Sequence, residues 1–196
     1  MKYIAETLSF LFHPVIFFLI MPFLVVYRYT GSNEAALRWE IFSALFVGVA
    51  IAIVLIGRKR RIFSDCDLSK REERFEFYAF ILFFSAIYVA SSLLLRGFIF
   101  PMTLIAIGIA CGVIVFDMLN RYIKASNHVA VASAFVTTVW LFYGSISFVF
   151  VSWIVPVLMW ARLVLQKHTK QEAIVGGILG IIITLLTFVF GKYIYR

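Results

Sequence analysis

Long runs of apolar residues, separated by short polar segments, make up most of the chain. Seven runs have about the length that a helix needs to cross a bilayer, and they lie at approximately 14–28, 41–57, 76–95, 98–118, 128–144, 146–163 and 172–190. Backbone groups in lipid must be hydrogen-bonded within their own segment, and the runs lack the two-residue alternation of a membrane barrel. The pattern therefore predicts an all-α, polytopic transmembrane helix bundle with about six to seven spans.

The N-terminal segment before the first apolar run mixes polar with apolar positions. We expect residues 1–13 to form a short interfacial helix rather than a cleavable signal, because Glu6 interrupts the apolar stretch and no small-residue cleavage site follows. The sequence contains no internal repeat and no linker long enough to separate two units. Residues 1–196 are therefore predicted to form a single integral membrane domain.

Composition supports the membrane interpretation. Apolar residues make up 63% of the 196 residues and charged residues 14%, against about 45–50% and about 25% in soluble proteins. A soluble body of this size cannot bury so large an apolar fraction. The two cysteines, Cys66 and Cys111, form no CxxC pair, which excludes a disulfide scaffold and a zinc site built on cysteine pairs.

The basic residues are distributed unevenly. A net charge of +8 would suggest a nucleic acid partner in a soluble protein, whereas in a membrane protein it indicates orientation and affinity for anionic lipid or phosphate. If all seven runs cross, most of the 18 Lys and Arg residues fall on one side, in segments 58–74, 121–124 and 162–170. The positive-inside rule places this side in the cytoplasm. We therefore expect a multi-pass cell-membrane protein whose partners are lipids and not nucleic acid, with its active site facing the cytoplasm.

The segment before the last run carries the clearest candidate chemistry. His168 and Glu172 are separated by four positions, so they share one face at the start of the last helix. The carboxylate can accept the proton of one imidazole nitrogen and leave the other nitrogen as a free lone pair, which a nucleophilic histidine requires. Arg162, at the end of the preceding run, can bind phosphoryl oxygens with two parallel hydrogen bonds. These three residues predict a site for a phosphate ester.

A second polar segment opens the fifth run. Ser126 is a good N-cap for a helix that begins near His128, and the free N–H groups of such a helix start attract an anion. His128 is then placed to protonate a leaving oxygen.

These residues resemble the signatures of a known family. Arg162-x5-His168-x3-Glu172 is similar to the third signature of the type 2 phosphatidic acid phosphatase superfamily, S-R-x5-H-x3-D, and the segment 124–128 (K-A-S-N-H) is similar to its second, P-S-G-H. The resemblance covers roughly residues 58–190. It implies a metal-independent phosphatase without a cofactor, in which His168 forms a phosphohistidine, Glu172 orients it, and His128 acts as acid and then as base. Arg162 and Ser126 would hold the phosphate.

The sequence departs from the signatures at several positions. Ala161, Ala125, Asn127 and Glu172 stand for Ser, Pro, Gly and Asp. Asparagine tolerates a left-handed backbone better than most residues, so we expect Asn127 to substitute for the glycine and to contact the phosphate. Glu172 is one methylene longer than Asp and still reaches an imidazole.

The family's first signature, K-x6-R-P, is matched least well. Arg74 is the best candidate for its arginine, but Asp67 stands at the lysine position. We expect Lys124 or Lys70 to supply the missing cation. Two further cations of the polar segments are expected at the phosphate: Arg71 and Arg121. The alternative for segment 58–74 is a solvated basic loop.

Other polar residues have simpler interpretations. Asp65 and Asp67 are a weak alternative as Mg²⁺ ligands on a diphosphate, and Asp65 is more simply the cap of a helix beginning near Leu68. His13, which precedes a proline, is interpreted as an interfacial residue. The glycines of segment 176–180 predict close helix packing rather than a phosphate loop.

Two classes of function remain. The first is a lipid phosphatase, with an isoprenoid diphosphate as the favoured substrate, phosphatidic acid or phosphatidylglycerol phosphate as the alternative, and undecaprenyl diphosphate if the orientation is reversed. The second is a bundle that binds or transports a lipid phosphate without turnover. Both His128 and His168 are present, which favours the enzyme, because binding alone requires no nucleophile.

Overall fold

The computed structural model describes residues 1–68, 70–95 and 101–194. In this part of the chain the regular secondary structure is helical: α1 (Lys2–Leu11), α2 (Pro14–Thr30), α3 (Asn33–Lys59), α4 (Glu73–Leu95), α5 (Met102–Asn120), α6 (Asn127–Tyr143), α7 (Ser145–Ser152), α8 (Ile154–Val164) and α9 (Lys170–Ile194). The all-α prediction is therefore confirmed. The start of the predicted run 98–118, and the link 96–97 before it, lie outside the described residues.

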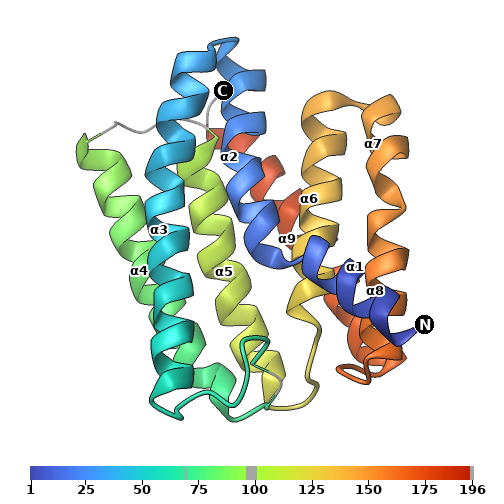
Figure 1. The fold of residues 1–196 in the computed structure, drawn as a ribbon. Coiled ribbons are helices and arrows are strands. Elements are labelled where there is room, and N and C mark those ends of the chain that lie inside the picture. Colours follow the sequence, from blue (N-terminus) through green and yellow to red (C-terminus); the bar gives the residue numbers. More distant parts are fainter. Residues whose placement is uncertain (69, 96–100, 195–196) are drawn as a thin grey trace.

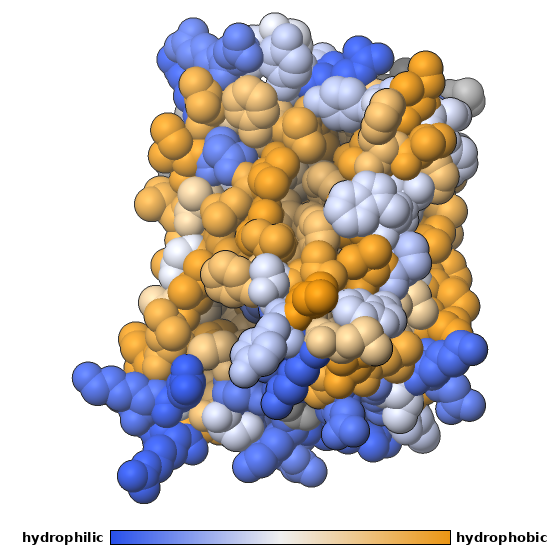
Figure 2. All heavy atoms as spheres, turned by 45° about the vertical axis from the view of Figure 1, so that its right-hand side comes forward, coloured by the Kyte–Doolittle hydropathy of each residue, from blue (hydrophilic) through white to orange (hydrophobic). Residues whose placement is uncertain are grey.

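The long helices run up and down along a common direction (Figure 1). Six segments of the described chain are long and apolar enough to cross a membrane: Lys2–Thr30, Asn33–Lys59, Glu73–Leu94, Met102–Asn120, Ser145–Val164 and Lys170–Tyr193. The remaining predicted run, 128–144, forms α6, an apolar helix of 17 residues. Figure 2 shows the apolar side chains as a broad band between two polar ends. The protein is a multi-pass membrane bundle, as the sequence predicts.

The short N-terminal helix is also observed. α1 lies at a steep angle to the other helices, beside α8, in Figure 1. His13 then caps α2, because its Nδ1 atom accepts a hydrogen bond from the Val15 N–H at 3.3 Å, and Pro14 occupies the first helical position. This cap fixes the imidazole of His13 at the start of the first long helix.

Helices α6 and α9 pack closely along the predicted glycine stripe. A Cβ atom at Gly180 would lie 2.1 Å from the carbonyl oxygen of Ala130, and one at Gly176 would lie 2.5 Å from the carbonyl oxygen of Ser126. The stripe is therefore helix packing, as predicted. It brings the polar start of α9 against the polar start of α6.

The described residues of the three polar connections 60–72, 121–126 and 165–169 lie together at the lower end of the bundle in Figure 1. One local prediction is wrong here. Asp65 does not cap a helix near Leu68, since α4 begins only at Glu73. Its Oδ1 atom instead accepts a hydrogen bond from the Asp67 N–H at 3.0 Å, and Leu68 adopts a left-handed backbone with φ 52°. The resulting turn lets the connection fold back beneath the bundle.

Candidate functional site

Hydrogen bonds to backbone carbonyl groups join the segments at the starts of α6 and α9. The Ser126 N–H donates to the carbonyl oxygen of Glu172 at 3.0 Å, and the ammonium group of Lys124 donates to the carbonyl oxygen of Lys167 at 3.1 Å. Ser126 also caps α6, since its hydroxyl accepts from the Val129 N–H at 3.5 Å. The predicted cap is observed, and the Ser126 hydroxyl is engaged in it.

Arg74 ties the first polar connection to the second. Its guanidinium donates from Nε to the carbonyl oxygen of Leu68 at 3.1 Å and from Nη1 to that of Ala125 at 2.9 Å. The side chain is 2% exposed. Arg74 therefore fixes the backbone of both connections. Its positive charge also acts on the nearby imidazole of His168.

His168 and Glu172 meet at the start of α9, as their spacing predicts. Nδ1 of His168 lies 3.3 Å from Glu172 Oε2 and 3.2 Å from the carbonyl oxygen of Lys124. Glu172 also caps the helix, since its Oε2 accepts from the Thr169 N–H at 2.9 Å and its own N–H donates to the Thr169 hydroxyl at 3.3 Å. This reciprocal capping box holds the carboxylate beside the imidazole.

The protonation state of His168 follows from its surroundings. Burial, and then the positive charges of Arg74, Arg162 and Lys124, lower the pKa of His168 to about 3. The imidazole is therefore neutral near pH 7. Both atoms facing Nδ1 are hydrogen-bond acceptors, so Nδ1 carries the proton and Nε2 carries the lone pair. The same environment acts on Lys124, whose pKa is lowered by burial first and by the Arg74 charge second.

His128 is buried in the first turn of α6. It is 5% exposed, and its Nε2 atom has no hydrogen-bond partner among the described residues. Nε2 lies 3.8 Å from Asp67 Oδ1, and the ring meets that of His13 edge to face, with centroids 4.9 Å apart. The imidazole thus faces a cluster of polar groups rather than lipid.

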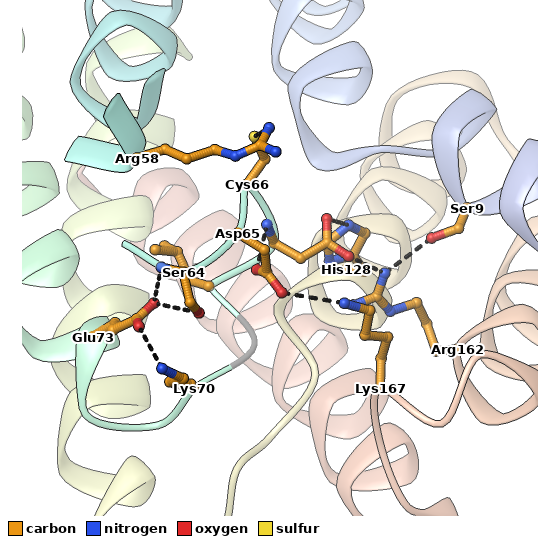
Figure 3. A network of polar contacts seen from close by, with 12 residues as sticks. Ser9, Arg58, Ser64, Asp65, Cys66, Lys70, Glu73, His128, Arg162 and Lys167 are labelled. Atoms are coloured by element: carbon orange, nitrogen blue, oxygen red, sulfur yellow. Dashed lines mark hydrogen bonds and ion pairs between the residues drawn. The ribbon is translucent and has the colours of Figure 1, made fainter. Parts of the chain in front are cut away.

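Arg162 lies at the centre of this cluster. Its Nη1 atom donates to Asp67 Oδ2 at 2.8 Å and to the Ser9 hydroxyl at 2.9 Å, whereas its buried Nε has no partner among the described residues. Figure 3 shows Arg162 and Lys167 pointing toward the connection that carries Asp65, with Ser9 approaching Arg162 from α1. The carboxylate of Asp67 therefore already accepts a hydrogen bond from the guanidinium group that the sequence predicts to bind phosphate.

Asn127 is positioned differently from the prediction. It is the first residue of α6 and has no positive φ, so it does not replace a glycine in a left-handed conformation. Its side-chain Oδ1 accepts a hydrogen bond from the Tyr78 hydroxyl at 3.0 Å. Asn127 thus links α6 to α4 beside the site.

Three predicted phosphate ligands have other surroundings. The ammonium group of Lys70 is 3.8 Å from Glu73 Oε1, and the Lys70 side chain is 65% exposed. Arg71 donates from Nε to the Asn120 carbonyl oxygen, and Arg121 is exposed and lines a surface depression with Arg71. Of the two lysines proposed for the missing cation, Lys124 lies nearer to the candidate site: its backbone carbonyl faces His168 Nδ1, its ammonium group donates to the Lys167 carbonyl oxygen, and its charge lowers the pKa of His168.

The two aspartates do not share one site. Asp65 Oδ2 accepts from the Lys167 ammonium group at 3.2 Å, whereas Asp67 faces Arg162 and the two imidazoles of His13 and His128. Among the described residues, the group that could hold a metal is instead His13, Asp67 and His128, whose ligand atoms lie within 4.8 Å of one another. The sequence interpretation missed His13, and the available signal was a histidine at the start of an apolar run.

None of the family models, curated proteins or solved structures that were compared with the chain matches it.

Proposed function

We propose that the protein is an integral membrane hydrolase that releases phosphate from a lipid phosphate or diphosphate. The observation that carries the proposal is His168: a buried, neutral imidazole whose Nδ1 faces Glu172, so that its Nε2 is a nucleophile. Arg162 and His128 lie at the same end of the bundle, and the charge of Arg162 acts on His168. These are the residues that resemble the type 2 phosphatidic acid phosphatase superfamily.

The proposed reaction has two steps. Nε2 of His168 attacks phosphorus while the bond from phosphorus to the leaving oxygen breaks, and protonated His128 gives its proton to that oxygen. The carboxylate of Asp67 faces the same Nε2 atom of His128 at 3.8 Å. In the second step His128 takes a proton from water, the water oxygen attacks phosphorus, and the phosphorus–nitrogen bond breaks. Phosphate leaves and His168 is again neutral.

The apolar band of the bundle supports a lipid as substrate. The polar site lies at one end of the band, so a tail can lie among the helices while its head reaches the basic connections (Figure 2). We propose that this end faces the cytoplasm, because it carries most of the basic residues. An isoprenoid diphosphate is then the favoured substrate, and phosphatidic acid or phosphatidylglycerol phosphate is the alternative.

The test is phosphate release from farnesyl diphosphate and from phosphatidic acid by the purified protein in detergent, with chelator present. We expect His168→Ala to lower the rate by about 10³-fold or more, because the nucleophile is lost. Lys170→Ala, an exposed neighbour, is the matched control and keeps the wild-type rate. Brief incubation with labelled substrate should leave an acid-labile phosphohistidine on the wild type and on Lys170→Ala, but not on His168→Ala.

Two outcomes would contradict the proposal. Hydrolysis by His168→Ala at the wild-type rate would exclude this residue as nucleophile. A wild-type protein that binds these lipids but releases no phosphate would support the binding or transport bundle instead. The carboxylate of Asp67 on Arg162 is the observation that favours this second function, because it occupies a phosphate-binding group without any substrate.

A further inference from the structure

Three side chains from distant parts of the chain converge beside the proposed nucleophile. His13 comes from the cap of α2, Asp67 from the connection between α3 and α4, and His128 from the first turn of α6. Asp67 Oδ1 lies 3.9 Å from His13 Nε2 and 3.8 Å from His128 Nε2. All three ligand atoms lie within 4.8 Å of one another. Donors around one zinc ion lie closer together than this, so the three side chains would turn slightly inward on binding.

A buried atom without a partner points to a ligand at this place. Nε2 of His128 is enclosed by protein, in a residue that is 5% exposed, and among the described residues it finds no hydrogen-bond partner. Buried polar atoms are almost always satisfied, and an exception requires an explanation such as an ion. The atom is directed at the one carboxylate oxygen that Arg162 does not hold, since Arg162 binds Oδ2.

We propose that His13, Asp67 and His128 bind one divalent transition-metal ion, with Zn²⁺ as the representative of the class. Two imidazole nitrogens and one carboxylate oxygen suit zinc, cobalt or nickel, whereas magnesium and calcium prefer oxygen ligands alone. Three protein ligands leave a fourth position for water or an anion. Arg162 holds the far oxygen of Asp67 at 2.8 Å, as an outer residue that orients a metal ligand does.

Binding has a local consequence at the start of α2. The Val15 N–H donates to His13 Nδ1 at 3.3 Å, so the neutral ring carries its proton on Nε2. A metal ion on Nε2 moves this proton to Nδ1, and the contact with Val15 is then lost. The nearby positive charge of Arg162 also opposes a cation, although Asp67 compensates it. An anion in the fourth position would lower the remaining charge.

The site also has a consequence for the proposed function, on which this step rests. Nε2 of His128 is the atom that we propose to donate and accept the catalytic proton, and a metal ion occupies its lone pair. Zn²⁺ should therefore inhibit phosphate release. Because His13 takes no part in the proposed reaction, its replacement should relieve the inhibition.

The direct test measures binding without any activity. Untagged, full-length protein in detergent is stripped with chelator and titrated with Co²⁺, whose visible absorption reports imidazole and carboxylate ligands, and Zn²⁺ is then added as competitor. We expect one bound ion per chain. His13→Asn should weaken binding by about tenfold or more, because asparagine keeps the helix cap but offers a poor ligand.

Matched controls separate the site from its surroundings. Asp65→Asn changes a carboxylate of the same connection that faces Lys167, and His168→Ala removes the third histidine; both should bind Co²⁺ as the wild type does. His128→Ala should weaken binding as His13→Asn does. Size-exclusion elution and helical circular dichroism of each variant show that it is folded.

Clear results would overturn the inference. One is a wild-type protein that shows no visible absorption on addition of Co²⁺. The other is a folded His13→Asn variant that binds Co²⁺ as tightly as the wild type does. Phosphate release in chelator by a protein that binds no Co²⁺ would leave the proposed function standing and remove the metal site. Co²⁺ binding by a protein that hydrolyses no lipid phosphate would support the metal site and contradict the proposed function.

Discussion

Single residues at the site serve structure and proposed chemistry together. Glu172 accepts the backbone N–H of Thr169, which caps α9, and it lies beside Nδ1 of His168. Arg74 holds two backbone carbonyl groups while its charge lowers the pKa of His168. Because each of these residues has a structural and a proposed chemical role, replacing it by alanine would remove both roles at once. A conservative substitution is needed to separate the two effects.

Glu172→Gln separates the cap from the charge. The amide oxygen still accepts the Thr169 N–H, but the negative charge beside His168 is lost, so phosphate release should fall by roughly 10²-fold or more with little change in stability. Thr169→Ala is the complementary control: it removes one hydrogen bond of the cap, costs about 1 kcal/mol, and leaves the rate nearly unchanged. Steady-state kinetics and thermal melting measure both effects. An unchanged rate in Glu172→Gln would remove Glu172 from the reaction.

The pH dependence of stability reports the burial of His168. Its pKa is about 3 in the folded protein and 6.5 for an exposed histidine, so the unfolded chain takes up the proton first as the pH falls. Stability from this residue is complete above pH 6.5 and decreases toward pH 3, by at most about 1.4 kcal/mol per pH unit.

Thermal melting between about pH 7 and about pH 5 tests this direction. We expect the melting temperature of the wild type to fall over this interval and that of His168→Asn to fall less, since asparagine does not titrate. Equal slopes for the two proteins would show that His168 is not buried as a neutral ring.

Among the helices, close contacts between neighbours place the site. Helices α6 and α9 approach along Gly176 and Gly180, and this approach allows the hydrogen bond from the Ser126 N–H to the Glu172 carbonyl. Elsewhere, Pro22 interrupts the hydrogen bonding of α2, and Glu40 of α3 accepts the neighbouring Phe23 N–H at 3.0 Å.

Gly180→Ala should separate α6 from α9. The new methyl group would meet the Ala130 backbone at 2.1 Å, and backbone atoms cannot yield as a flexible side chain can. We expect a loss of about 1–3 kcal/mol and a large loss of phosphate release, because the two polar helix starts move apart. Gly48→Ala in α3 is the control, since nothing lies within 4 Å of its Cβ position. Thermal melting in detergent compares them, and equal stability would contradict the close packing.

Taken as a whole, the bundle has one chemically rich end. The three polar connections lie together at the lower end in Figure 1, next to an apolar band that suits the interior of a bilayer (Figure 2). The side of the membrane that this end faces decides which lipid phosphates can reach it. Cys66 lies exposed in the first polar connection, so it can report that side.

Cysteine labelling from each face of the membrane gives the orientation. In a Cys111→Ser background, a membrane-impermeant maleimide should label Cys66 only after intact cells are permeabilised, because the basic end is expected in the cytoplasm. The Cys66→Ser, Cys111→Ser double variant gives the background. Labelling of intact cells would reverse the orientation and favour undecaprenyl diphosphate as substrate.

Features that depend on local pattern could be predicted from the amino-acid sequence. The number and length of apolar runs predicted the all-α membrane bundle, the spacing of four residues placed His168 beside Glu172, and the glycine stripe identified a close helix contact. These features follow from the helical repeat and from the thickness of the bilayer. Both act within one segment of the chain.

The meeting of polar groups from different segments could be seen only in the folded bundle. The proximity of His13 to His128, the carboxylate of Asp67 on Arg162, and the contact of Glu40 with Phe23 join residues from different helices and connections. The sequence interpretation placed Lys70 at the phosphate and Asp65 at a helix cap. In the structure Lys70 lies beside Glu73, and Asp65 accepts a hydrogen bond from Lys167 of another connection. The partner of a buried polar group is set by how several helices pack together, and no periodicity within a single segment records that packing.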